Sequence, residues 1–214
     1  MDLQQGLIGH WTMDSRDFDN GTIRDKSGHG NHGSATSGLT FGEPAIVGTG
    51  VLFSDTSDEQ ITISPISSTD LTLSCWYRYD GLGNGIWNTP FGDGNGTEHH
   101  ILIEEDGSGE IGFYNGSFYG SGYNLSVGEW YHIVTVKSGT QQKIYVNNDL
   151  KLDSNNSFDN SASDNSFETI GNYEPGANQS SLGVLDDVRA YNRMLSEDEI
   201  NALYNMRSQQ VRQA

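Results

Sequence analysis

Short apolar segments separated by turn-forming residues run along most of the chain. In residues 71–79, Leu71, Leu73 and Cys75 alternate with Thr72 and Ser74. This period of two is typical of a strand whose two faces meet different surroundings. Further strands are predicted at residues 7–13, 50–54, 61–64, 99–105, 110–116, 130–136, 142–148 and 182–191. The turns DGSG and SGTQ join four of these segments into two hairpins. The pattern predicts an all-β protein, a two-sheet antiparallel β-sandwich.

Three segments differ from this pattern of short strands. Residues 196–205 predict one short C-terminal helix, with Ser196 and Glu199 in the spacing of a capping box. Residues 14–38 and 153–166 are polar and are expected to be long loops. We therefore expect one domain over residues 1–206, followed by a C-terminal tail at residues 207–214.

Charge narrows the range of partners. The 214 residues include 29 Asp and Glu against 11 Lys and Arg, which gives a net charge of -18. Such a surface repels phosphate, so no nucleic acid partner is expected. Self-repulsion of this size suits either a halophilic protein from a high-salt environment or an acidic extracellular module. The chain has no apolar run long enough to span a membrane, so no membrane insertion is expected.

Two motifs at opposite ends of the chain carry a family resemblance. GLIGHWTMD and DKSGHGNHG stand near the start, and LDDVRAYNRMLSEDEINALY stands near the end. Together they resemble the concanavalin A-like, laminin G-like (LamG) jelly-roll domains of the lectin/glucanase superfamily, over roughly residues 6–205. The resemblance implies a jelly-roll sandwich, and it leaves the function open because many functions share this fold.

A structural calcium ion is the expected cofactor. The DKSGHGN loop offers Asp25 and Asn31, whose oxygens suit Ca²⁺. The resemblance implies that such an ion joins this loop to Asp186 at the start of the final strand, with Asp14 or Asp187 as further ligands. The alternative is that Asp25 and Asn31 only close turns while Asp186 pairs with an arginine.

Aromatic side chains in glycine-rich segments are the candidate ligand-binding residues. Tyr114, Phe118, Tyr119 and Tyr123 lie in GFYNGSFYGSGYN, and Trp87 lies in GNGIWNTPFGDGNG. Tyrosine rings with Gly, Ser and Asn around them are typical of adaptable binding surfaces, and sugar faces stack on such rings. The alternative for each ring is a place in the core of the sandwich.

Enzymatic and zinc chemistry have weaker support. Glu104 and Glu110 resemble the paired acids of glycoside hydrolases, but the DGSG turn between them separates them onto two strands. His99 and His100 point to opposite faces of a strand and do not suit one zinc ion. We therefore expect no catalytic residues.

These observations favour a non-enzymatic surface recognition module that binds a glycan or a cell-surface receptor. Its expected place is extracellular or on a virion surface, where subunits of a virion or another surface assembly would be further partners. One alternative is a structural or decoration subunit of a viral particle with no glycan binding, and a second is a glycoside hydrolase.

Overall fold

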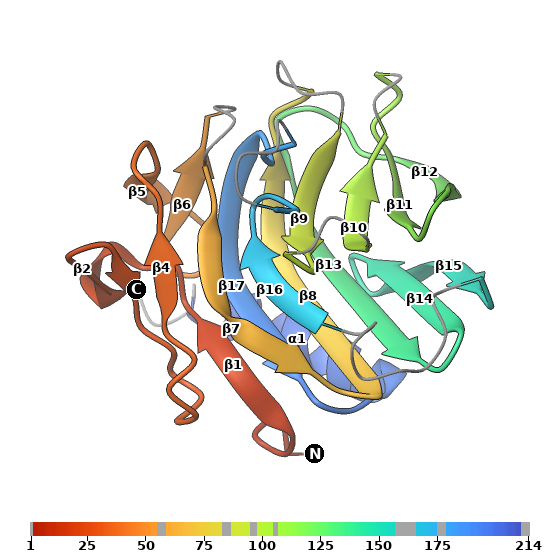
Figure 1. Cartoon of the computed structure of the whole chain (residues 1–214), viewed down its shortest axis with the longest axis horizontal. Coiled ribbons are helices and arrows are strands. Elements are labelled where there is room, and N and C mark those ends of the chain that lie inside the picture. Colours follow the sequence, from red (N-terminus) through yellow and green to blue (C-terminus); the bar gives the residue numbers. More distant parts are fainter. Residues whose placement is uncertain are drawn as a thin grey trace.

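The computed structural model describes residues 2–54, 59–82, 87–94, 98–104, 107–156, 166–174 and 179–210, with side chains up to residue 206. Within these residues the strands form two antiparallel sheets, one of eight strands and one of nine, stacked as a sandwich (Figure 1). The predicted fold class is confirmed. The α-helix α1 (Glu197–Gln210) lies behind the eight-stranded sheet in this view.

The eight-stranded sheet has the order β15 (Asp149–Ser154), β14 (Gln141–Val146), β13 (Glu129–Ser138), β8 (Asp70–Tyr79), β17 (Gly183–Tyr191), β6 (Thr49–Phe53) and β5 (Thr40–Pro44), and β1 (Leu7–Trp11) also pairs with β17. The nine-stranded sheet has the order β12 (Phe118–Asn124), β11 (Glu110–Tyr114), β10 (His99–Ile103), β9 (Asn88–Gly92), β16 (Ser166–Ile170), β7 (Ile61–Ser67), β4 (Gly33–Ala35), β3 (Thr22–Ile23) and β2 (Phe18–Asp19). A 3₁₀ turn, η1 (Ser15–Asp17), precedes β2.

Both faces of β8 are buried, for different reasons. Leu73 and Cys75 belong to the main core between the sheets. On the opposite face, Trp76 is covered by α1 and stacks on Tyr204 with ring centroids 5.6 Å apart. The two-faced alternation in the sequence therefore reflects two apolar layers, one inside the sandwich and one under the helix.

The structure contains strands in segments that the sequence pattern assigns to loops or leaves unassigned. The short strands β2, β3 and β4 lie within the polar segment 14–38. The segments of β5, β9, β12 and β15 are also strands. At the other end, α1 continues to Gln210, into the segment expected to be a tail, because no Gly or Pro interrupts residues 206–210.

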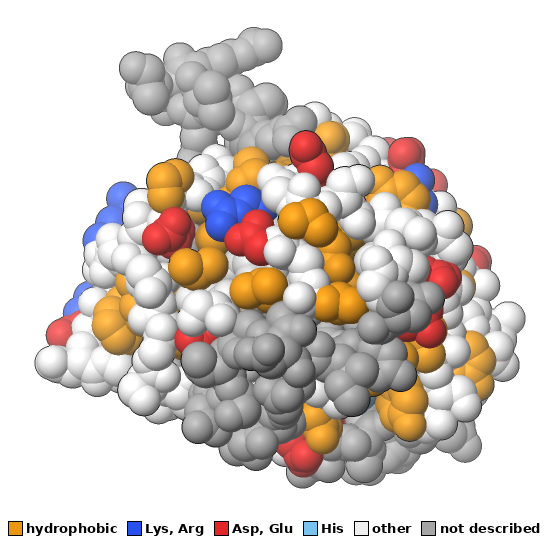
Figure 2. All heavy atoms as spheres, turned by 90° about the horizontal axis from the view of Figure 1, so that it is seen from above, with side chains coloured by type: hydrophobic (Ala, Val, Ile, Leu, Met, Phe, Trp, Pro, Cys, Tyr) orange, Lys and Arg blue, Asp and Glu red, His pale blue; other side chains and the backbone are white. Residues whose placement is uncertain are grey.

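The face of the molecule at the upper edge of Figure 1 carries dispersed hydrophobic groups among polar and acidic ones. Figure 2 looks onto the loops at the upper edge of Figure 1 and shows separate hydrophobic groups among polar ones, with Lys and Arg at few positions. No helix in the described part of the chain is both long and apolar enough to cross a bilayer.

Candidate functional site: an aromatic pocket on the nine-stranded sheet

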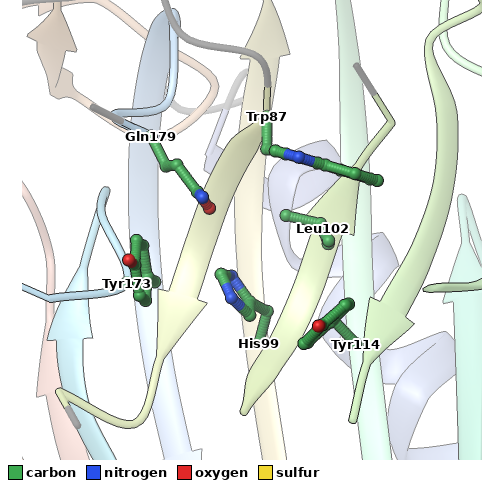
Figure 3. A pocket seen from close by; sticks show the side chains of 6 residues that line it. All are labelled: Trp87, His99, Leu102, Tyr114, Tyr173 and Gln179. Carbon is green, nitrogen blue, oxygen red and sulfur yellow. The ribbon is translucent and has the colours of Figure 1, made fainter. Parts of the chain in front are cut away.

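A pocket of about 280 Å³ opens on the outer face of the nine-stranded sheet, away from the eight-stranded sheet. Strands β10 and β11 form its floor, and residues that precede β9 and follow β16 form its sides (Figure 3). The lining side chains point toward one another and are Trp87, His99, Leu102, Tyr114, Tyr173 and Gln179. The pocket is thus mainly aromatic, and its polar groups are an amide, an imidazole, two tyrosine hydroxyls and an indole N–H.

Strand register brings the aromatic rings together. His99 pairs with Tyr114, and Tyr114 pairs with Phe118 on the next strand, so the three side chains share one face of the sheet. The His99 ring meets the Tyr114 ring edge-on, with ring centroids 5.3 Å apart, and stacks on the Tyr173 ring, with centroids 4.6 Å apart. The Phe118 ring packs against the Trp87 ring, with ring centroids 5.5 Å apart, and so supports the wall of the pocket from outside.

Two glycines allow the walls to approach the sheet. A Cβ atom on Gly92 would lie 2.5 Å from Tyr173 Cα, and one on Gly112 would lie 2.7 Å from the Phe118 ring. Any larger residue at either position would displace the neighbouring segment. Gly92 therefore sets how closely the Tyr173 segment lies against β9.

His99 is held as a neutral ring at physiological pH. Its Nδ1 atom lies 3.0 Å from Thr89 Oγ1, which orients the imidazole. Burial lowers the pKa of His99 to about 4, and this effect outweighs the nearby negative charge of Asp93. Thr89 is fully buried, so its hydroxyl orients the ring and is not exposed as a nucleophile.

A buried ion pair lies beneath this pocket and joins the two sheets. Lys137 on β13 donates a hydrogen bond to Glu98 Oε1, and both side chains are 1% exposed. His100 turns into the same interior and donates from Nε2 to Ser166 O at 2.7 Å. The adjacent residues His99 and His100 therefore face opposite sides of β10, as expected from the sequence.

The structure separates the five predicted ligand-binding aromatics into two groups. Trp87 and Tyr114 line the pocket, and Phe118 packs on Trp87. Tyr119 and Tyr123 lie on the opposite face of β12 and pack against the main core, where Tyr119 stacks on Phe113 at 5.1 Å. For these two tyrosines the structure supports the alternative that the sequence left open, a place in the core.

Sequence reasoning missed four lining residues, His99, Leu102, Tyr173 and Gln179. His99 and Leu102, both buried, share the pocket-lining face of the sheet because a register shift interrupts β10 between them. Tyr173 and Gln179 stand on either side of the sequence EPGAN, whose Pro and Gly are turn-forming residues and were the available signal.

The described lining contains no carboxylate pair. None of its six side chains is an Asp or a Glu. Glu110 instead accepts a hydrogen bond from Gly122 N at 2.6 Å, and Glu104 N donates to Glu110 O at 2.9 Å. Glu110 therefore stabilises the neighbouring strand, outside the pocket.

Asp25 and Asn31 organise the N-terminal loop. Asp25 accepts hydrogen bonds from the backbone N–H groups of His10, Ser27 and Asn31, all within 2.9 Å. Although burial opposes it, these bonds lower the pKa of Asp25. Asn31 donates from Nδ2 to Ile8 O at 2.7 Å and accepts from Trp11 Nε1 at 2.8 Å. Protein groups thus occupy both carboxylate oxygens of Asp25.

Asp186 has different surroundings. Its Oδ2 accepts from Val47 N at 2.8 Å, whereas its buried Oδ1 has no hydrogen-bond partner. Burial, with the charges of Asp187 and Asp14, raises the pKa of Asp186 to about 8. Asp14 accepts from Thr49 N at 2.8 Å in the same loop region. Asp14 Oδ2 also accepts from an Arg16 guanidinium N–H at 2.7 Å, so of these two carboxylates only Asp186 keeps a partner-free oxygen that suits a hard cation.

Asp187 is held by a histidine and an arginine. His10 Nε2 lies 2.7 Å from Asp187 Oδ1, and Arg189 donates to the same carboxylate. These contacts outweigh burial and lower the pKa of Asp187 to about 2. Among the described residues, no three His, Cys, Asp or Glu side chains are grouped to hold a metal. A calcium ion at Asp186 would therefore also need backbone or other oxygens, and the calcium site stays a prediction.

Comparison with known proteins identifies the same fold. One similar structure is domain 4 of AbnA, an extracellular GH43 arabinanase from Geobacillus stearothermophilus, solved in complex with arabinotriose. It matches with a TM-score of 0.73 and 18% sequence identity, over 92% of this chain and 98% of that domain. The binding domain of Paraclostridial Mosquitocidal Protein 1 matches at 0.71 and 18% identity, over 95% of this chain and 53% of that one. Trypanosoma rangeli sialidase matches at 0.70 and 18% identity, over 94% of this chain and 33% of the sialidase.

A search of curated proteins found no match. The family model described as the concanavalin A-like lectin/glucanases superfamily matches residues 53–201, which is more than half of the chain. This stretch contains the strands β7 to β17 and all six residues that line the pocket. The chain belongs to the concanavalin A-like lectin/glucanase superfamily.

Proposed function

We propose that this protein is a non-enzymatic carbohydrate-recognition module that binds one sugar unit in the aromatic pocket. The observation that carries the proposal is the convergence of Trp87, Tyr114 and Tyr173 around His99 and Gln179. Aromatic rings stack on the C–H face of a sugar, while an amide and an imidazole can bind its hydroxyl groups. A volume of about 280 Å³ suits a single ring rather than a long chain.

The similar structures support this proposal at the level of the fold. One is described in complex with arabinotriose and another as the binding domain of a toxin. Parts of two hydrolytic enzymes also share the fold, so the fold alone does not separate binding from catalysis. The described lining favours binding, because glycoside hydrolysis uses two carboxyl groups and none of the six side chains provides one.

A glycan array tests the proposal directly. We expect the wild-type protein to bind a restricted set of oligosaccharides. Trp87→Ala should weaken binding to those hits by about tenfold or more, which corresponds to roughly 1.4 kcal/mol. Tyr123→Ala is the matched control, since Tyr123 lies on the core side of β12, and binding per folded molecule should not change. Hits that survive Trp87→Ala unchanged would contradict the assignment of the pocket.

Structural calcium forms a second part of the proposal. We place it at Asp186 with Asp14, because Asp186 Oδ1 is buried without a partner and the two carboxylates are close enough to interact electrostatically. The ion would hold the loop at Val47 and Thr49 to the final strand. Action outside the cell or on a virion surface stays a prediction.

A further inference from the structure

The pocket offers no positive charge to a ligand. Its described lining consists of three aromatic side chains, a leucine, an amide and an imidazole. The imidazole of His99 is neutral above about pH 4, because burial opposes its protonation. No Lys or Arg belongs to this lining. A carboxylate that entered the pocket would therefore find no cationic partner among these side chains.

Negative charge lies next to the pocket instead. Asp93 is 4% exposed, and its charge acts on both His99 and Tyr173. Glu174 follows Tyr173 directly and forms a hydrogen bond with its hydroxyl group. Burial and these two acids raise the pKa of Tyr173 to about 12, so the phenol stays uncharged. Both acids would repel an anionic ligand at this wall of the pocket.

The chain segments next to the site in sequence do not supply a cation either. Residues 83–86 precede Trp87, residues 95–97 precede Glu98, and residues 175–178 precede Gln179. None of these segments contains a Lys or an Arg. With a net charge of -18, the protein as a whole also disfavours the approach of anions.

From this arrangement we infer that the pocket selects uncharged sugars and excludes sugars that carry a carboxylate, such as sialic and uronic acids. The inference rests on the proposed sugar-binding function and names the ligand class of the same pocket. Its physical basis is the cost of moving a carboxylate out of water without a charged partner, next to Asp93 and Glu174.

Matched pairs of glycans provide the test. The probes are neutral oligosaccharides, such as lactose, and the same cores capped with sialic acid, such as 3′-sialyllactose, together with neutral and uronic-acid-substituted xylan fragments. We expect binding only to neutral members, with affinity unchanged when NaCl is raised tenfold. Binding of an acid-capped member that depends on Trp87 would overturn the inference and leave the sugar-binding function standing. If no saccharide binds, the proposed function fails, and the inference with it.

Charge variants of Gln179 give a second, independent readout. Gln179→Lys adds a cation to the lining, and Gln179→Glu is the control of similar size with the opposite charge. We expect Gln179→Lys to gain at least about tenfold in affinity for acid-capped members, and high salt should remove this gain. Gln179→Glu should gain nothing. Equal affinity of wild type and Gln179→Lys for acid-capped members would contradict the view that a missing cation excludes them.

Discussion

Asp186 is the residue at which protonation would compete with the proposed calcium ion. Its buried carboxylate has one oxygen bound to Val47 N and one without a partner. The pKa of Asp186 is about 8 in the folded state, against an ordinary value of 3.8 in the unfolded chain. Between pH 3.8 and pH 8 the folded state therefore holds a proton on this carboxyl group that the unfolded chain has lost. The contribution of this group to stability is therefore present below about pH 4 and is lost as the pH rises toward 8.

Asp186→Asn should reveal both effects. With EDTA at about pH 8, the variant should melt several degrees above the wild type, because it removes an uncompensated buried charge. At pH 4 the difference should disappear. With calcium at fixed ionic strength, the wild type should gain stability and the variant should not. Thermal melts at the two pH values, with and without calcium, check this. A wild-type melting temperature that is the same in EDTA and in calcium would contradict the metal site.

Gly92 is predicted to control the shape of the pocket. Gly92→Ala places a methyl group 2.5 Å from Tyr173 Cα, so the segment must move. We expect a loss of about 1–3 kcal/mol in the free energy of unfolding, together with weaker glycan binding. Ser117→Ala, in the exposed turn between β11 and β12, is the control and should change neither quantity. Urea denaturation and glycan titration of both variants provide the measurement.

At the scale of elements, β10 links the ligand face of the molecule to its interior. His99 faces the pocket, while Glu98 just before the strand pairs with Lys137 of the opposite sheet. A buried ion pair contributes little net stability, but breaking it leaves a charge in an apolar interior. The pair therefore fixes the position of β10 relative to β13.

Lys137→Met should be severely destabilising, by about 3–5 kcal/mol, because Glu98 would remain buried without its cation. The double variant Lys137→Met/Glu98→Leu should recover most of this loss, since neither charge is left. Urea denaturation of the wild type, of Lys137→Met, of Glu98→Leu and of the double variant gives the coupling energy. Equal stabilities of the single and double variants would show that the charge of Glu98 is not the cause.

The sequence pattern predicts strands in which apolar and polar residues alternate regularly, and β9 and β12 are among the strands that it misses. The β8 segment is evident because its Leu and Cys residues alternate with polar ones. In contrast, β9 reads NTPFG and β12 reads FYGSGYN, and these compositions are typical of turns. Pairing with neighbouring strands decides their conformation, and a single sequence does not show pairing.

The same limit applies to the site. Trp87 and Tyr114 are recognisable as aromatics in glycine-rich segments, and both line the pocket. Tyr119 and Tyr123 stand in a segment of the same composition. The alternation of β12 places their side chains on the core side of the sheet, whereas Phe118 points to the other side. Recognising β12 as a strand would have separated the two groups, because neighbouring side chains of a strand point to opposite faces.

At the scale of the whole molecule, charge repulsion is a general term in stability. The net charge is -18. Repulsion between the surface charges reaches about 10 Å in 0.1 M salt and only about 3 Å in 1 M salt. We expect the melting temperature to rise between these salt concentrations in EDTA at neutral pH, because screening relieves the repulsion. Thermal melts in NaCl and KCl check this, and both salts should act alike. A melting temperature that falls with salt would contradict the screening argument.

The position of β17 affects how the protein is made. This strand, formed by Gly183–Tyr191, lies between β8 and β6 and also pairs with β1, although it comes near the end of the chain. During translation the eight-stranded sheet therefore lacks a central member until its last strand has left the ribosome. Until then β1 and β6 have no partner on that side, and their open edges are exposed to other nascent chains. This sheet can close only once β17 has been made, and a chain that stops before β17 should be a substrate for chaperones rather than a smaller folded domain.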